Sequence, residues 1–179
     1  YKMGKTTFSG PVVSLAGFNP SGYANVVTLG DSGGTEAVSL TAADHGGRIL
    51  STRLDHTLTC TLPAINGTDP VDETTPGQVS NYGLTFRIMI SYTIANLTIN
   101  TASAADEFFG ATTINTEAVN GATESATFFA NDTDVGIAIV GDNTGYLPGG
   151  MVELTATNQG WLCNGTKLLS ADTPTTPFI

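Results

Sequence analysis

Charged residues are scarce in this sequence: they make up 12% of its 179 residues, and only six of them are Lys or Arg. Solvated helix faces need Glu, Lys and Arg, so this composition excludes a mainly helical fold. The six basic residues stand against 16 acidic ones and leave a net charge of −10. Because a chain of this charge repels phosphate, we expect no nucleic-acid partner.

Long apolar runs and cysteine motifs are also missing. No segment approaches the roughly 20 apolar residues that span a bilayer, and no secretion signal opens the chain. The sequence therefore predicts a soluble protein that does not bind membranes. The two cysteines, Cys60 and Cys163, lie in separate apolar segments without CxxC spacing. This arrangement indicates neither a zinc site nor a redox motif, and it predicts two buried free thiols.

Threonine and glycine are abundant, with 29 and 21 copies. Short alternating runs recur between Gly, Asn, Asp and Pro, which is typical of β-strands separated by turns. The pattern predicts an all-β fold, an antiparallel β-sandwich or barrel of jelly-roll type with about ten short strands. The expected strands are 25–29, 35–40, 48–54, 57–62, 83–92, 94–99, 125–130, 135–140, 150–157 and 160–163.

The ends of the chain differ from its middle. Residues 1–24 repeat Gly, Pro and Ser every few positions and are expected to form an extended N-terminal arm. Residues 25–170 would then form the β domain, and the Pro-rich residues 171–179 a tail. Within the domain, Thr41 is expected to cap one helical turn that ends at Gly46. Residues 66–82 are the longest polar stretch and predict a surface loop.

The letters GDSGG at residues 30–34 match the sequence around the nucleophile of trypsin-like proteases. In those enzymes the serine follows its histidine and aspartate in the chain, whereas here Ser32 precedes His45 by 13 residues. A strand between the two would carry them on the order of 20 Å apart. We therefore interpret GDSGG as the loop of a β-hairpin, and no catalytic residue is assigned.

The chain has two histidines, and each follows an aspartate, in the pairs Asp44–His45 and Asp55–His56. They bracket one expected strand, and Asp55–His56 is interpreted as a two-residue hairpin link to the next. The two rings would then lie roughly 25 Å apart, too far for one metal ion. The segment 131–136 begins like a calcium loop but lacks later ligands. No metal or cofactor is predicted, although a looser calcium site at 131–145 remains open.

Trp161 is the only tryptophan, and the alternating strand before it is typical of a closing hairpin. A buried core position is expected, with a sugar-stacking platform as the alternative. A spike or fibre module that binds host glycans would use Trp161 or the loop residues Tyr82 and Tyr146. No carboxylate pair with the spacing of a hydrolase is visible, so the sequence predicts a protein that is not an enzyme.

Five segments together resemble the virion decoration proteins of tailed bacteriophages, most strongly those of marine podoviruses. The most specific are the opening TTFSGPV and the closing Gly-Trp hairpin. The segments are TTFSGPVVSLAGF (6–18), SLTAADHGGRIL (39–50), TLPAI (61–65), GLTFRIMI (83–90) and GGMVELTATNQGWLCNG (149–165).

The resemblance implies a β-rich protein on the outer capsid surface of a virion. Its expected role is to cement the shell by bridging copies of the major capsid protein. It is also expected to form a homo-oligomer, a trimer rather than a dimer. The candidate partner-binding residues lie in the arm and would contact the capsid or a neighbouring copy; they are Phe8, Pro11, Val12, Phe18 and Tyr23. The alternative is the glycan-binding fibre or spike module.

Overall fold

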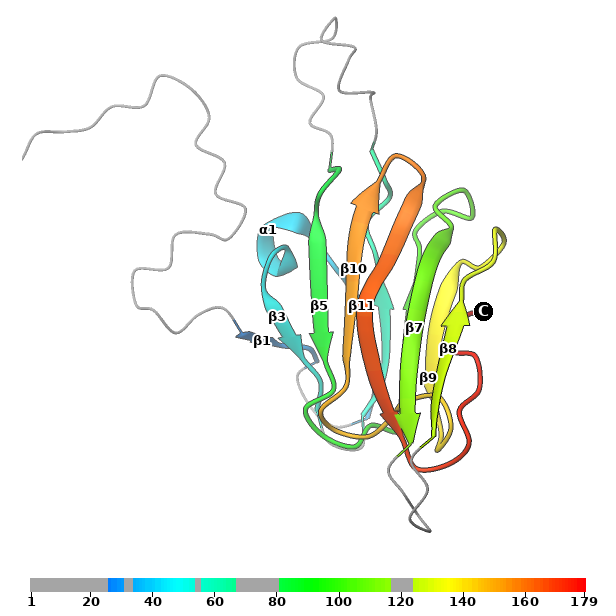
Figure 1. Ribbon diagram of the computed structural model, residues 1–179. Helices are drawn as coiled ribbons and strands as arrows, with labels where there is room; N and C mark the ends of the chain where they lie inside the picture. The colour runs from blue at the N-terminus through cyan, green and yellow to red at the C-terminus, as the bar shows by residue number, and fades with distance from the viewer. Residues whose placement is uncertain (1–25, 31–33, 54–55, 67–80, 117–123) are drawn as a thin grey trace, which may run out of the picture.

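The computed structural model describes residues 26–30, 34–53, 56–66, 81–116 and 124–179. These residues form a nearly all-β sandwich of two mixed sheets, with one short helix (Figure 1). The predicted all-β class is therefore confirmed. Among the described residues, no helix has the length and apolar character needed to cross a membrane.

The described residues form eleven strands and one helix. The seven strands of the larger sheet, here called sheet A, are β1 (Val26–Thr28), β3 (Ile49–Ser51), β5 (Thr85–Met89), β7 (Phe108–Thr116), β8 (Ser125–Phe129), β10 (Met151–Thr157) and β11 (Gly160–Ser170). The four strands of the smaller sheet, sheet B, are β2 (Thr35–Ser39), β4 (Thr57–Thr61), β6 (Asn96–Asn100) and β9 (Gly136–Val140). The helix is α1 (Ala42–His45).

The first six strands alternate between the two sheets. Each strand from β3 to β6 therefore lies beside the strand two places earlier and runs parallel to it. The predicted antiparallel, jelly-roll-like pairing is wrong for this half of the chain. Apolar alternation fixes which face of a strand is buried, but it does not fix the direction of the neighbouring strand.

Both predicted short hairpins in this half are wrong for the same reason. GDSGG connects β1 in sheet A to β2 in sheet B, and residues 52–56 connect β3 in sheet A to β4 in sheet B. A hairpin joins neighbouring strands of one sheet, so neither segment forms one. Both are crossings from one layer of the sandwich to the other.

The second half of the chain pairs differently. The order of sheet A is β1-β3-β5-β10-β11-β7-β8, so the β10–β11 hairpin lies between β5 and β7. Thr157 stands opposite Gly160 at its turn, which confirms the predicted Gly-Trp hairpin. Antiparallel pairing also joins β8 to β7 and β9 to β6. Sheet B has the order β2-β4-β6-β9.

The core fills the space between the sheets. In β4, Leu58 and Cys60 point inward and are buried, while Thr57, Thr59 and Thr61 alternate with them and point outward. Trp161 is fully buried, with its ring centroid 5.7 Å from that of Phe86. This confirms its predicted core position. Cys60 and Cys163 are buried free thiols, also as predicted.

Strand β7 was absent from the prediction, and β11 is longer than predicted. Both strands place polar side chains in the core, so their sequences lack the apolar–polar alternation that predicts a strand. Thr112 of β7 is fully buried and lies 3.3 Å from Cys163 Sγ, and Thr166 of β11 lies 3.2 Å from the same sulfur. The sequence Asn164–Gly165 indicates a turn, but here it sits at a register shift within a continuous strand.

Two smaller predictions concern the turn at α1 and the tail. Thr41 caps α1 by accepting a hydrogen bond from the Asp44 backbone N–H at 3.1 Å, and Gly46 follows the helix as predicted. The tail, however, is part of the domain. Phe178 pairs with Ile137 of β9 and is only 6% exposed, so the last residues close one end of the sandwich.

Candidate functional site

The opposite end of the sandwich has a cleft between its two edge strands, β1 and β2. The cleft has a volume of about 330 Å³ and lies between Thr28–Gly30 on one side and Glu36–Val38 on the other, with His45 of α1 also lining it. Its formation follows from topology: β1 and β2 each end their sheet, so no further described strand covers the interior there. Figure 1 shows β1 and α1 at this end, and β8 and β9 at the other.

Glu36 brings a carboxylate into the cleft. Alternation along β2 places Glu36 on the same, inward side as Val38, and the Glu36 carboxylate lies 3.4 Å from His56 Nε2. His56 is 1% exposed, and neither ring nitrogen forms a hydrogen bond within the described part of the chain. The 3.4 Å approach of the carboxylate to the ring is thus a close contact without hydrogen-bond geometry.

Gly30 allows this approach. Its φ of +80° is in the left-handed region, and a Cβ at this position would overlap the His56 ring and the Glu36 carboxylate. Only glycine combines that backbone angle with the required space. Gly30, the first residue of the GDSGG motif, therefore has a packing role.

His45 lies at the α1 side of the cleft. Its Nδ1 accepts a hydrogen bond from the Thr41 backbone N–H at 3.0 Å, which requires an unprotonated nitrogen. Burial lowers the pKa of His45 from its ordinary value of 6.5, while Asp44 opposes that shift. The ring is therefore neutral at pH 7 and works as a local hydrogen-bond acceptor.

The chemistry of this cleft suits binding. Its side chains offer apolar surface, one carboxylate and a neutral imidazole, and the described lining contains no thiol. Burial raises the pKa of the Cys60 thiol to about 12 and also raises that of Cys163, so neither is a ready nucleophile. Within the described residues, no three His, Cys, Asp or Glu side chains gather closely enough to hold a metal ion.

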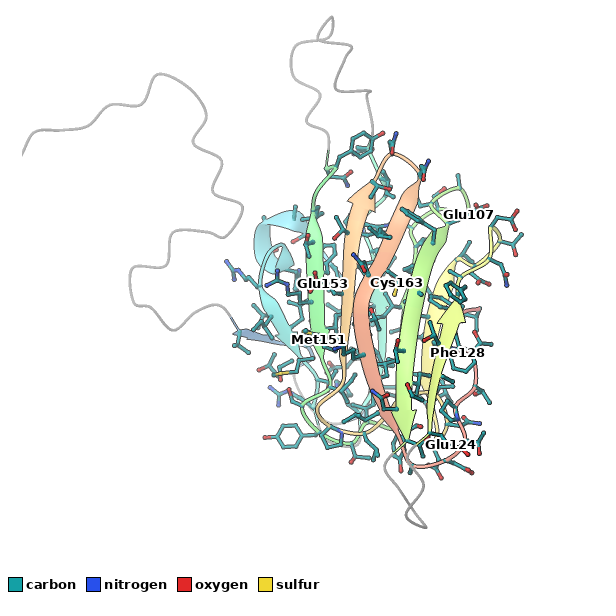
Figure 2. All side chains as sticks on the ribbon, viewed as in Figure 1. Glu107, Glu124, Phe128, Met151, Glu153 and Cys163 are labelled. Carbon is teal, nitrogen blue, oxygen red and sulfur yellow. The ribbon has the colours of Figure 1, made fainter. Side chains whose placement is uncertain are left out.

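A second feature is the outer face of sheet B. The strand registers place the outward positions in three rows across β2, β4, β6 and β9, and none of these positions holds a charged residue. The rows are Thr35, Thr57, Asn96 and Val140; Ala37, Thr59, Thr98 and Ala138; and Ser39, Thr61, Asn100 and Gly136. The outer face of sheet A differs, since Arg87 and Glu153 pair across it at 3.3 Å. Figure 2 labels Glu153 on this sheet.

The predicted sites have different outcomes. The arm residues Phe8, Pro11, Val12, Phe18 and Tyr23 lie outside the described residues. The same holds for Ser32 and for residues 67–80 of the predicted surface loop.

Trp161 is fully buried and so offers no sugar-stacking surface. Asp134, from the candidate calcium segment, is 8% exposed and accepts a hydrogen bond from the Asn131 backbone N–H at 2.7 Å. That bond closes a turn and gives Asp134 a structural role.

The cleft itself was missed by sequence reasoning. A signal exists, because Glu36 alternates in phase with Val38 and Leu40 and is therefore a carboxylate on the inward side of a strand. The contact between Glu36 of β2 and His56, which directly precedes β4, joins residues 20 apart in the chain, and no local sequence pattern predicts it.

No family model matches the chain, and comparisons with curated proteins and with solved structures also found no match. The resemblance to virion decoration proteins therefore stays a prediction.

Proposed function

We propose that this protein is a non-enzymatic structural protein of a phage virion, which decorates and cements the outer surface of the capsid. The observation that supports this most is the uncharged outer face of sheet B on a chain with net charge −10. Interface centres are depleted in charged residues, since burying an unpaired charge is costly. A face of this kind suits a protein partner.

Threonine and asparagine suit such a face because they donate and accept hydrogen bonds without charge. In the middle row, Thr59 and Thr98 lie on neighbouring strands and make no hydrogen bond to each other. Both threonines lie on the outer face, where a hydroxyl can bond to a partner, because the inward neighbours Leu58 and Leu97 fill the core. The major capsid protein is the proposed partner.

Avidity explains how modest contacts hold such a protein on a shell. An oligomer that engages several identical sites gains affinity through the effective concentration of its linked copies. The N-terminal arm, with Phe8 and Phe18, is proposed to supply this linkage. Removing the arm is therefore expected to weaken shell binding even though the β domain retains its face.

The test is co-sedimentation with heads that lack the protein. We expect the full-length chain to bind saturably at a fixed ratio to the shell subunit, and the chain without residues 1–24 to bind poorly. Thr59→Arg, which puts a charge in the middle of the face, should also abolish binding. Thr127→Arg is the matched control, because Thr127 is an exposed threonine on β8 of the other sheet. Binding that survives both Thr59→Arg and arm removal would reject the shell role.

A further inference from the structure

The two ends of the sandwich are built differently. At the β9 end, the C-terminal residues act as an added edge strand: the Ala138 backbone N–H donates to the Pro177 carbonyl at 2.7 Å, and the Ile179 N–H donates to the Gly136 carbonyl at 3.0 Å. Phe178 between them enters the core. A short Pro-containing segment with one aromatic side chain thus seals that end.

The β1–β2 end has an open cleft and lacks such a segment among the described residues. Its cleft of about 330 Å³ is large enough for an aromatic side chain and is walled by Leu29 and Val38. Val26 of β1 is 53% exposed at the same end. Edge strands of this kind accept an added strand through their unpaired backbone groups.

From these features we infer that the cleft binds the N-terminal arm of a second copy of this chain. The arm has the required composition: it is apolar, contains Phe8 and Phe18, and includes Val12, Val13 and Leu15 around Ser14. This is the same kind of segment as the Pro-Phe-Ile that closes the other end.

Charge favours this occupant. Residues 1–25 carry Lys2 and Lys5 and no acidic residue. Since the whole chain has a net charge of −10, taking these two positive charges away leaves −12 for the remaining residues. The described lining of the cleft includes the Glu36 carboxylate, which lies beside His56, and no Lys or Arg, while Asp44 and Arg48 have opposite effects on the pKa of His45. A basic apolar segment therefore meets an acidic apolar cleft.

Reach favours exchange between copies. Phe8 precedes Val26 by 18 residues, which can extend on the order of 60 Å. Closing the cleft of its own copy would need only a turn and a short strand. An arm of this length reaches a neighbour on a lattice, and this exchange would give the linkage on which the proposed shell role depends.

The test uses full-length chains with single added cysteines. Thr28→Cys marks the cleft and Phe18→Cys marks the arm, with Phe8→Cys and Val12→Cys as alternative arm positions. The native thiols of Cys60 and Cys163 are buried and will not exchange. We expect an isotope-labelled Thr28→Cys chain mixed with unlabelled Phe18→Cys to form a disulfide between the two chains. Thr127→Cys in place of Thr28→Cys is the control and should give none.

Two results would overturn the inference. One is an intrachain disulfide in the Phe18→Cys/Thr28→Cys double variant with no link between chains, which would mean that the arm closes its own cleft. The other is the absence of any disulfide from all three arm positions. As a second readout, Thr28→Trp should fill the cleft and reduce the oligomer to monomers in sedimentation, whereas Thr127→Trp should not.

The disulfide and co-sedimentation experiments test the cleft inference and the shell role separately, although the inference rests on the proposed shell role for its lattice setting. If the chains link through the cleft but do not bind heads, the shell role fails and the cleft assignment stands. If heads bind the chain saturably while no arm position links to Thr28→Cys, the shell role stands and the cleft assignment fails.

Discussion

At the scale of single residues, Trp161 has the largest side chain of the fully buried residues. It packs against Phe86, and its indole N–H has no hydrogen-bond partner among the described residues. Its contribution is therefore apolar contact area, with a small cost from the unpaired N–H.

We expect Trp161→Ala to lower the free energy of unfolding by about 4 kcal/mol, because it leaves a large cavity between the sheets. Trp161→Phe should cost much less, since it keeps an aromatic ring and removes the unpaired N–H. Urea unfolding followed by circular dichroism measures both. Tyr92→Ala, at a position 55% exposed, is the control and should change stability by less than about 0.5 kcal/mol. Equal losses for all three variants would contradict the core assignment.

The cysteines predict a pH dependence at the alkaline end. Burial raises the pKa of Cys60 to about 12, whereas an exposed thiol ionises near 9. Between these values the unfolded chain loses the proton and the folded chain keeps it, so stability decreases as pH rises from about 9 to 12. Cys60→Ala should flatten this decline in urea midpoints measured across that range. An unchanged slope in the variant would show that other groups cause it.

At the scale of elements, the sequence predicted the strands whose inward residues are apolar. The runs at β4, β5, β6, β9 and β10 have clean alternation and were found within a few residues of their expected bounds. β7 was missed because Thr112 and Thr116 occupy inward positions and Gly110 interrupts the run. The buried Thr112 is tolerated because Cys163 lies within hydrogen-bonding distance, a contact between residues 51 apart that no local pattern reveals.

The closing segment at β9 provides a test of one element. Phe178→Ala should lower the free energy of unfolding by about 3 kcal/mol, because it empties a buried site at the sandwich end. Phe129→Ala removes the same side chain from a position 72% exposed on β8, and it should cost less than about 0.5 kcal/mol. Thermal or urea unfolding distinguishes the two. A stability of Phe178→Ala equal to that of Phe129→Ala would mean that the tail does not seal the core.

At the scale of the whole molecule, the sequence predicted the class but not the path of the chain. Strand periodicity predicted a β-sandwich or barrel, and composition excluded a mainly helical fold. The alternation of successive strands between the layers depends on the five crossings that follow β1 to β5, and the sequences there do not differ from those of ordinary turns and loops. The candidate cleft depends on that path, because only this winding leaves β1 and β2 at the same end. The site was therefore out of reach of local sequence reasoning.

The central position of the β10–β11 hairpin in sheet A also sets an order of folding. β5 pairs with β3 and β7 pairs with β8, but the second neighbour of each is a strand of this hairpin. The hairpin, residues 151–170, follows both strands in the sequence. Until it is in place, sheet A consists of two separate pieces, each with an exposed inner edge. The slowest step of folding should therefore be insertion of this hairpin between two sheet fragments.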